Sequence, residues 1–203
     1  MEKSEVQAIA SHVWETGIHE LKRLSETTDW DALGSIVKKL AHRSGRIHVT
    51  GAGTSGVAAK KIAHTLSCVE APAYYLNPAD AVHGSLGSVQ PGDVVIMISK
   101  GGKTRELIQL LPGLAQKQVS IIAVTEAKES PIAQQADDIL LYHVEHEADS
   151  FDMLATTSTM IVIALFDAVC MAFMQYTGFT KQQFALIHPG GAVGERLNSK
   201  EHA

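Results

Sequence analysis

The first forty residues alternate apolar and polar positions with the period of amphipathic helices. Val6, Ile9 and Val13 recur three or four residues apart, and the pattern continues to Leu24. After a polar break, Asp29 precedes a second run of the same period that ends at Leu40. Asp is a favoured residue at a helix N-cap. The pattern therefore predicts two amphipathic helices, at Ser4–Leu24 and Asp29–Leu40.

From Arg46 the period changes to short apolar runs that end in small or polar residues and alternate with helical segments. The runs predict strands at Ile47–Thr50, Ala73–Leu76, Val94–Ser99, Ser120–Thr125 and Ile139–Tyr142. The segments between them predict helices at Ser55–Cys68, Thr104–Lys117 and Pro131–Ala136. Strands that are apolar on both sides and alternate with helices indicate a parallel sheet covered on both faces. We expect an α/β fold, a three-layer α/β/α sandwich with a five-stranded parallel sheet.

The last third of the chain is dominated by an apolar segment. Phe151–Tyr176 has almost no polar face and predicts a long helix that is buried all round, in part against another subunit, or else the central helix of a monomer. Its most apolar stretch, Met160 to Met174, is interrupted by Asp167 and is shorter than the ~20 residues that span a bilayer. Phe179–Gly194 predicts a short helix that ends in a Pro-Gly-Gly loop.

Composition narrows the class of protein. Among 203 residues, 45% are hydrophobic and 19% charged, which is typical of a compact globular chain. We expect a single domain over residues 1–203, with helices in 1–44 and an α/β core with C-terminal helices and loop in 45–203. The net charge of −5, without a basic cluster, argues against nucleic acid as a partner. Acidic residues interrupt the first twenty positions, and the two cysteines suggest no disulfide framework. These features favour a cytoplasmic protein without a membrane partner.

Two glycine-rich loops follow predicted strands and open predicted helices. They read Gly51-Ala52-Gly53-Thr54-Ser55-Gly56 and Ser99-Lys100-Gly101-Gly102-Lys103-Thr104. Glycine allows the backbone to approach an anion, and a helix N-terminus offers free N–H groups. We therefore expect a phosphate cradle, with the following binding residues: Gly51, Gly53, Thr54, Ser55, Ser99, Gly101, Gly102, Lys103 and Thr104.

The first loop also fits the GxGxxG pattern of dinucleotide-binding folds. That pattern expects an acidic residue at the end of the next strand, to hold the ribose. The next predicted strand ends in Asn77 and Pro78 instead. Either loop by itself can be an ordinary strand-to-helix turn. A phosphate site that both loops face explains why two such loops occur together.

Further motifs resemble a known family. His83-Gly84-Ser85-Leu86-Gly87, Glu106, Glu147 and the stretch from Phe184 to Gly191, which includes His188-Pro189-Gly190-Gly191, are similar to the sugar isomerase (SIS) domain. Within it, the resemblance is closest to D-arabinose 5-phosphate isomerases. It implies a flavodoxin-like sheet, no cofactor, and a homotetramer in which the His-Pro-Gly-Gly loop enters a neighbouring subunit's site. Many members continue into paired CBS domains, which we expect to be lacking here because the chain stops at Ala203.

The resemblance has departures at the phosphate loops. The family has a lysine where this chain has Thr54. Its second loop usually carries Asn, Ser and Glu where this chain has Lys100, Gly101 and Lys103. Gly101 removes one hydroxyl, and either lysine can supply replacement charge to the anion or can be a solvated loop charge.

The activity that the resemblance implies is the interconversion of D-ribulose 5-phosphate and D-arabinose 5-phosphate through an enediol, in the biosynthesis of Kdo. Such an isomerase needs an anion clamp, a base that moves a proton between C1 and C2, and groups that relay protons on the oxygens. We assign the base to Glu147, with Glu106 as second candidate. His83 and His188 are assigned to ring opening and proton relay.

Other functions fit parts of the pattern. An isomerase for another sugar phosphate would explain Thr54 and the altered second loop. A non-catalytic SIS module that senses a sugar phosphate would need the loops but not the acid–base residues. Gly-Thr-Ser-Gly is also similar to the first loop of the MurNAc 6-phosphate etherases. His143 and His146, near Asp149 and Asp152, lie three apart on an expected strand and point to opposite faces, so we expect no metal.

Overall fold

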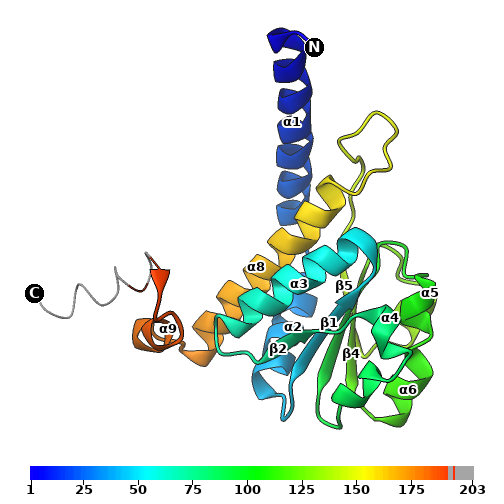
Figure 1. Ribbon diagram of the computed structural model, residues 1–203, viewed down its shortest axis with the longest axis vertical. Helices are drawn as coiled ribbons and strands as arrows, with labels where there is room; N and C mark the ends of the chain where they lie inside the picture. Colours follow the sequence, from blue (N-terminus) through cyan, green and yellow to red (C-terminus); the bar gives the residue numbers. More distant parts are fainter. Residues whose placement is uncertain (192–193, 195–203) are drawn as a thin grey trace, which may run out of the picture.

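A five-stranded parallel sheet forms the centre of the molecule in the computed structural model, which describes residues 1–191 and 194 (Figure 1). The strands are β1 (Ile47–Gly51), β2 (Ala73–Tyr75), β3 (Val94–Ile98), β4 (Ser120–Thr125) and β5 (Asp138–Leu141). Their order is β2-β1-β3-β4-β5, and every neighbouring pair is parallel. This is the flavodoxin-like order. The expected α/β fold with a five-stranded parallel sheet is confirmed.

Helices cover both faces of the sheet because successive strand side chains point to opposite sides. On β3, Ile96 and Ile98 pack into the core with α2 (Trp30–His42), α3 (Gly53–Ser67) and α8 (Thr157–Thr177). Val95 and Met97 pack on the other side. That side is covered by α4 (Pro78–Ala81), the 3₁₀ turn η1 (Ser85–Ser88), α5 (Arg105–Ile108), α6 (Leu111–Gln116) and α7 (Pro131–Gln134). The three layers match the prediction.

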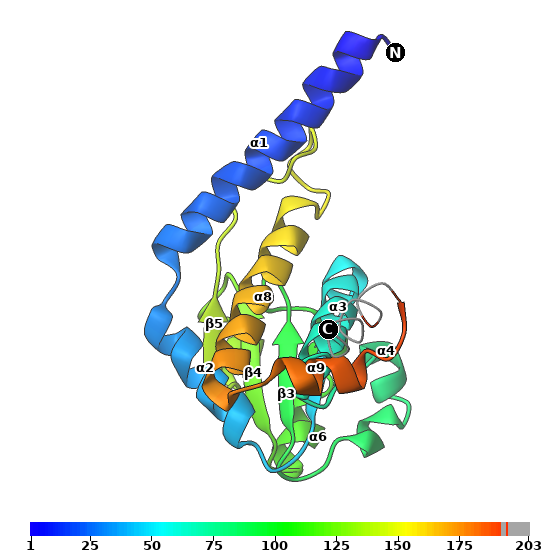
Figure 2. The same cartoon turned by 90° about the vertical axis from the view of Figure 1, so that its left-hand side faces the viewer.

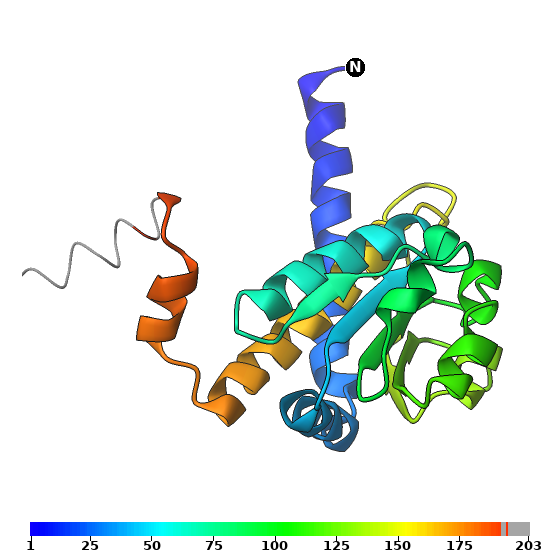
Figure 3. The same ribbon diagram turned by 60° about the horizontal axis from the view of Figure 1, so that its bottom comes forward.

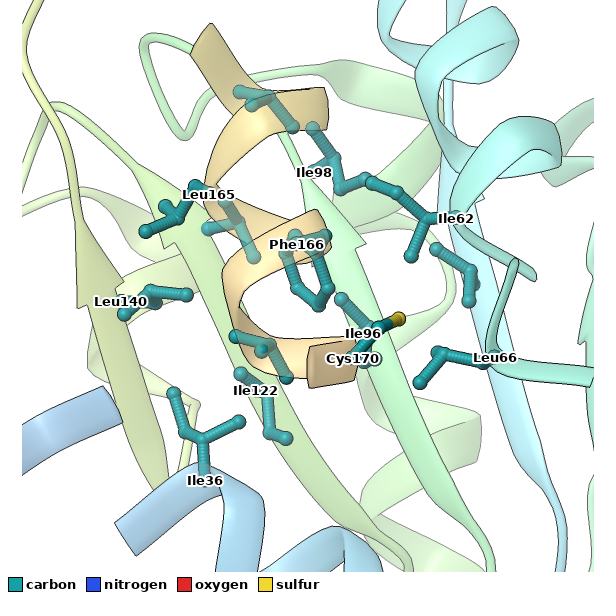
Figure 4. Packing of buried hydrophobic residues seen from close by; sticks show 14 of the residues in the cluster. Ile36, Ile62, Leu66, Ile96, Ile98, Ile122, Leu140, Leu165, Phe166 and Cys170 are labelled. Carbon is teal, nitrogen blue, oxygen red and sulfur yellow. The ribbon is translucent and has the colours of Figure 1, made fainter. Parts of the chain in front are cut away.

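The helix α8 lies across the sheet and supplies the centre of the larger core (Figure 4). Phe166 is 1% exposed and faces side chains from β3 and α3. By length and composition this 21-residue helix could cross a membrane, but half of its most apolar window is buried inside the molecule, as in a core helix. The helix begins at Thr157 rather than at Phe151. Phe151, Met153 and Leu154 instead lie in an exposed loop, held by N–H groups that donate to the Asp149 carboxylate.

Two other predicted helices differ from the structure. Thr104–Lys117 is not continuous: it divides into α5 and α6, with Pro112 in the first turn of α6. Proline has no N–H and its ring clashes with a preceding turn, so it begins a helix more readily than it continues one. The helix expected over Phe179–Gly194 is the shorter α9 (Lys181–Ile187), which is closed by a capping box between Thr180 and Gln183. Residues 192–193 of that prediction lie outside the described part.

The amino-terminal helix α1 (Lys3–Thr27) has its buried residues, Gly17 and Glu20, in its second half. Gly17 is buried so close to α8 that an added Cβ would lie 3.1 Å from the Cε of Met160. The first half extends beyond the body (Figure 2). Val6, Ile9 and Val13 are 50%, 54% and 39% exposed there. These residues lie on the same side of α1 as the buried Gly17, at helical spacing from it. One chain therefore leaves this apolar stripe of Val6, Ile9 and Val13 uncovered.

Candidate active site

The strand order reverses between β1 and β3, and both glycine-rich loops leave the sheet at this point. The segments that follow these two adjacent strands go to opposite faces of the sheet and leave a crevice between them, outside the carboxyl ends of the strands. Open α/β sheets bind their ligands in such a crevice. The first loop enters α3 at Gly53, and the second leads from Ser99 to α5. The topology therefore places the two predicted phosphate loops beside one crevice.

A cavity of about 430 Å³ occupies this crevice. Six of the predicted binding residues line it: Thr54, Ser55, Ser99, Gly101, Lys103 and Thr104. The others that line it are Ala58, Ile98, Lys100, Tyr142, Ala155, Ser158, Thr159 and Val162. Hydroxyl groups thus meet from the first turn of α3, from the second loop and from the first turn of α8, which is the donor set that a phosphate requires.

The three remaining predicted glycines, Gly51, Gly53 and Gly102, do not line the cavity. Gly53 has φ +57°, and space is restricted at the other two. An added Cβ on Gly51 would lie 2.7 Å from the backbone oxygen of Ser55, so the close turn into α3 requires glycine there. Gly102 has φ +60°, and an added Cβ would lie 1.9 Å from the Ser130 hydroxyl. Side chains other than hydrogen are excluded at both positions.

The hydroxyls of the second loop are already organised. Ser99 is 3% exposed, and its Oγ lies 2.8 Å from Oγ1 of Thr104 in a hydrogen bond. The N–H of Gly102 donates to the carbonyl of Ser99 at 3.0 Å, which closes the loop as a turn. A preformed turn spends little conformational entropy when an anion binds.

Glu147 lies directly behind the cavity wall, and its side chain is 3% exposed. Oε2 accepts the backbone N–H groups of Thr156 at 3.0 Å and Ser158 at 3.1 Å. Oε1 accepts from Nζ of Lys100 at 3.0 Å. The carboxylate thus satisfies N–H groups at the start of α8 that no helical carbonyl can reach, and its negative charge suits that end of the helix.

These contacts control the ionisation of Glu147. Burial alone would raise its pKa, but the hydroxyl and N–H of Ser158 and then the ammonium of Lys100 outweigh it, so the pKa lies below its ordinary value. Glu126, after β4, behaves differently. Burial raises the pKa of Glu126, and the charge of Lys100 opposes the rise only in part.

Glu106 and His83 lie outside the cavity lining. Glu106 occupies the first turn of α5 and is exposed. His83 is exposed between α4 and η1, where its N–H donates to the carbonyl of Asp80 at 3.0 Å. Glu147 does not line the cavity either, but its carboxylate accepts hydrogen bonds from Lys100 and Ser158, which do.

His188 does not line the cavity of its own chain. The first turn of α8 contributes to the cavity, whereas α9 follows the other end of α8 (Figure 3). Gln183 of α9 donates to Glu70, just beyond the last turn of α3, at 2.7 Å. His188 stacks on Phe184 with ring centroids 4.0 Å apart, and its Nδ1 lies 3.0 Å from the Phe184 carbonyl.

The sequence patterns do not predict several residues of the site. Ser158 and Thr159 were hidden in a predicted helix that began at Phe151, although the run Thr156 to Thr159 carries the hydroxyls typical of a helix start. Tyr142 and Glu126 follow β5 and β4 and carried no motif. Position after a strand was the signal that could have found them.

Titratable residues also gather beside α1. The strand expected at His143 and His146 is absent, because β5 ends at Leu141 and both histidines lie in the loop that follows. They approach different carboxylates, Glu126 at 3.7 Å and Asp152 at 3.3 Å. The donor atoms of His19, Glu20 and Glu145 lie within 4.8 Å of one another. Arg23, however, lies 2.9 Å from Glu145 and 3.4 Å from Glu20. A guanidinium already neutralises this group, which therefore fits a structural ion pair.

The comparison with protein families decides the relationship. The SIS domain model matches residues 39–170, which include the sheet, both glycine-rich loops and Glu147. The chain belongs to the SIS domain family. Among curated SIS proteins, arabinose 5-phosphate isomerase GutQ of Escherichia coli K12 is 37% identical over 185 residues, which are 91% of this chain and 57% of the relative. Arabinose 5-phosphate isomerase KdsD of Pseudomonas aeruginosa PAO1 is 40% identical over 153 residues, 75% of this chain and 47% of the relative.

Solved SIS structures agree with these matches. A Listeria monocytogenes protein, described as a candidate sugar-phosphate isomerase, is 47% identical with a TM-score of 0.91, over 94% of this chain and all of that one. A protein of Escherichia coli CFT073, solved in complex with arabinose 5-phosphate, is 28% identical with a TM-score of 0.89, over 93% of this chain and all of that one. This SIS domain spans a little over half the length of the curated relatives that match it first, such as GutQ.

Proposed function

We propose that this SIS domain is an aldose–ketose isomerase that interconverts D-arabinose 5-phosphate and D-ribulose 5-phosphate. The named relatives support this substrate, because GutQ and KdsD are arabinose 5-phosphate isomerases. The E. coli CFT073 complex with arabinose 5-phosphate supports it too. We further propose that the enzyme is cytoplasmic and supplies the precursor of Kdo for lipopolysaccharide or capsule.

One observation carries the proposal: a hydroxyl-lined cavity at a helix N-terminus adjoins a buried carboxylate. Ser99 and Thr104 offer paired hydroxyls to a phosphate, and Ser55 adds one from the first turn of α3. Glu147 lies behind the same wall, joined to it by Lys100 and Ser158. An anion clamp beside a carboxylate is the minimum that phosphate-anchored proton transfer requires.

The proposed reaction moves one proton between neighbouring carbons. In the open-chain aldose, the Glu147 carboxylate takes the proton from C2 while the C1 oxygen gains a proton, which forms the 1,2-enediol. The protonated carboxyl then returns a proton to C1 while the C2 oxygen loses its proton, which forms the ketose. Atoms and charge balance without a cofactor. The sequence-based assignment of Glu106 as second candidate for the base and of His83 as a proton relay remains part of this proposal.

We propose that His188 acts in a neighbouring subunit. It lies at the opposite end of α8 from the cavity of its own chain, so ring opening by this histidine requires a second copy. The uncovered stripe of Val6, Ile9 and Val13 on α1 supports assembly, because isolated chains seldom leave such a stripe in water. A homotetramer with shared sites accounts for both features.

Proton NMR in D₂O tests the reaction. We expect the protein to convert arabinose 5-phosphate to ribulose 5-phosphate and to exchange the C2 proton for deuterium. Glu147→Gln keeps the side-chain volume and removes the base, so we expect exchange to fall about 100-fold or more. If the unmodified protein shows neither conversion nor exchange, the proposal is overturned.

Isomerisation of another sugar phosphate is the second candidate. Thr54 stands where the family has a lysine, and Lys100 lines the cavity where the family usually has asparagine. A change of this kind at the cavity wall alters the groups that meet the sugar. Exchange of the C2 proton without net conversion of arabinose 5-phosphate would favour this alternative. Binding without exchange would favour a sensing module.

A further inference from the structure

Lys100 occupies an unusual place, between the phosphate cavity and the buried carboxylate. Its side chain is 42% exposed and lines the cavity, whereas the Glu147 side chain that it contacts is 3% exposed. The Lys100 carbonyl accepts the N–H of Glu126 and the hydroxyl of Thr125, both at 2.9 Å. The backbone of Lys100 is therefore fixed, while its long side chain can turn about its single bonds.

The two oxygens of Glu147 are held in different ways. Oε2 accepts two backbone N–H groups and lies 3.4 Å from the Thr156 hydroxyl, so the fold fixes its position. Oε1 accepts from Nζ of Lys100 at 3.0 Å, and the Ser158 hydroxyl also approaches the carboxylate and lowers its pKa. The flexible ammonium thus holds Oε1, and its departure would free this oxygen while Oε2 stays in place.

A phosphate in the cradle would compete with Glu147 for this ammonium. Lys100 follows Ser99 directly, and the hydroxyls of Ser99 and Thr104 face the same cavity that Lys100 lines. A phosphate dianion carries more charge than one carboxylate and offers several acceptor oxygens. Lys103 lines the cavity as well, but in the described part of the chain the lysine that donates to Glu147 is Lys100.

We propose that Lys100 is a positioning residue that couples phosphate binding to the freedom of Glu147. In the free protein its ammonium holds Oε1, and a phosphate in the cradle draws the ammonium away, which leaves Oε1 as an open acceptor. The coupling itself requires only that phosphate binds, and its catalytic consequence rests on the proposed isomerase function.

Other charged groups surround Glu147 and bear on its titration. Glu126 follows β4 and Tyr142 follows β5, and Glu147 acts on the ionisation of both. The remaining neighbours line the space between Glu147 and α1 or lie on its own segment: His12, Glu15, His19, Glu20, His146, Asp149 and Asp152. Most are acidic, so loss of the Lys100 charge leaves Glu147 among like charges and raises its pKa.

Carbon NMR of carboxyl-labelled glutamate measures this coupling directly. The Glu147 signal is assigned by its loss in Glu147→Gln, and inorganic phosphate is the probe. In the unmodified protein, saturating phosphate should raise the pKa of Glu147 by about one unit. Lys100→Met should raise the pKa by a similar amount without phosphate, and phosphate should then add only the smaller rise that its own negative charge causes. Lys100→Arg should restore the phosphate response.

Lys103→Met is the matched control, because it removes one charge from the same loop without touching Glu147. The pKa of Glu147 in Lys103→Met should follow that of the unmodified protein, with and without saturating phosphate. An unchanged pKa in Lys100→Met would overturn the proposal. So would a phosphate response in Lys100→Met as large as that of the unmodified protein, or the absence of any response in the unmodified protein.

Kinetics supply a second, separate readout. The acid limb of kcat/KM reports the free enzyme, in which Lys100 holds Glu147, and that of kcat reports the substrate complex. We expect the acid limb of kcat to lie at higher pH than that of kcat/KM in the unmodified protein, and the separation of the two limbs to be smaller in Lys100→Met. Equal separation of the limbs in both proteins would overturn the coupling. An unmodified protein that turns over no substrate would overturn the isomerase proposal, while the NMR titration would still decide the role of Lys100.

Discussion

Two adjacent glycines in the second loop serve different purposes. Gly102 has φ +60° and faces the Ser130 hydroxyl, so glycine is required by the backbone and by space. At Gly101 an added Cβ meets nothing within 4 Å, and the residue lines the cavity. The same residue type therefore marks a structural constraint at one position and an open place beside the ligand at the next.

This contrast leads to a prediction about phosphate affinity. Gly101→Ser places a hydroxyl in open space at the cavity wall, where the family usually has serine. We expect the protein to fold and its KM for sugar phosphate to be about 2- to 10-fold lower, because one hydrogen bond is added.

Gly102→Ala, in contrast, should lower the free energy of unfolding by about 1–3 kcal/mol or more through strain. Steady-state kinetics and urea denaturation measure the two effects. A higher KM in Gly101→Ser, with unchanged stability, would contradict the first.

At the scale of the element, α8 joins the core to the site. Its middle is buried against the sheet through Phe166, and its first turn presents Ser158 and Thr159 to the cavity. The Glu147 carboxylate from the preceding loop receives the N–H groups that begin the helix. The residue proposed as base thus also stabilises the start of this helix.

The pH dependence of stability should reveal this second role of Glu147. The pKa of Glu147 in the folded protein lies below its ordinary value of 4.5, so its contribution to stability is fully present above pH 4.5 and is lost as the pH falls through the folded value. We expect Glu147→Gln to be less stable than the unmodified protein by about 1–3 kcal/mol near pH 7, with a smaller difference below pH 4.5. Urea denaturation at several pH values measures it.

Glu129→Gln serves as the control, because Glu129 is exposed and its loss also removes one negative charge. A difference between Glu147→Gln and the unmodified protein that stays constant from pH 7 to pH 3 would contradict this role.

At the scale of the whole molecule, one chain leaves two features incomplete. α1 extends beyond the body with an uncovered apolar stripe, and His188 lies at the opposite end of α8 from the cavity of its own chain (Figures 1 and 2). Both features are explained if copies of the chain pack through α1 and exchange their carboxyl-terminal loops.

Charges in the stripe of α1 should therefore separate the copies. We expect the double substitution Val6→Glu and Val13→Glu to give monomers and to lower isomerase activity about 100-fold or more, since each site would lose a proton-transfer group. Light scattering after size exclusion and the NMR assay measure the two results. Gln7→Glu, on the same exposed helix half, should leave the assembly intact. A monomeric unmodified protein would contradict the shared site.

Much of this architecture could be predicted from the sequence. The apolar runs at β3 and β4 and the glycines after β1 and β3 were sufficient to predict the fold class and the position of both glycine-rich loops, because burial and turn geometry leave local patterns. Pro112 also signalled the end of α5 and the start of α6, but the apolar residues on both sides keep one helical period and so predict a single helix.

Tertiary structure alone decided which side chains meet. Glu147 and Lys100 are 47 residues apart, and their contact depends on β3 and β5 ending at the same edge of the sheet. Glu106 and His83 belong to family motifs, yet both are exposed and neither lines the cavity of its own chain. Sequence patterns record burial and local geometry, whereas contacts between distant residues arise only when strand order and crossovers are set.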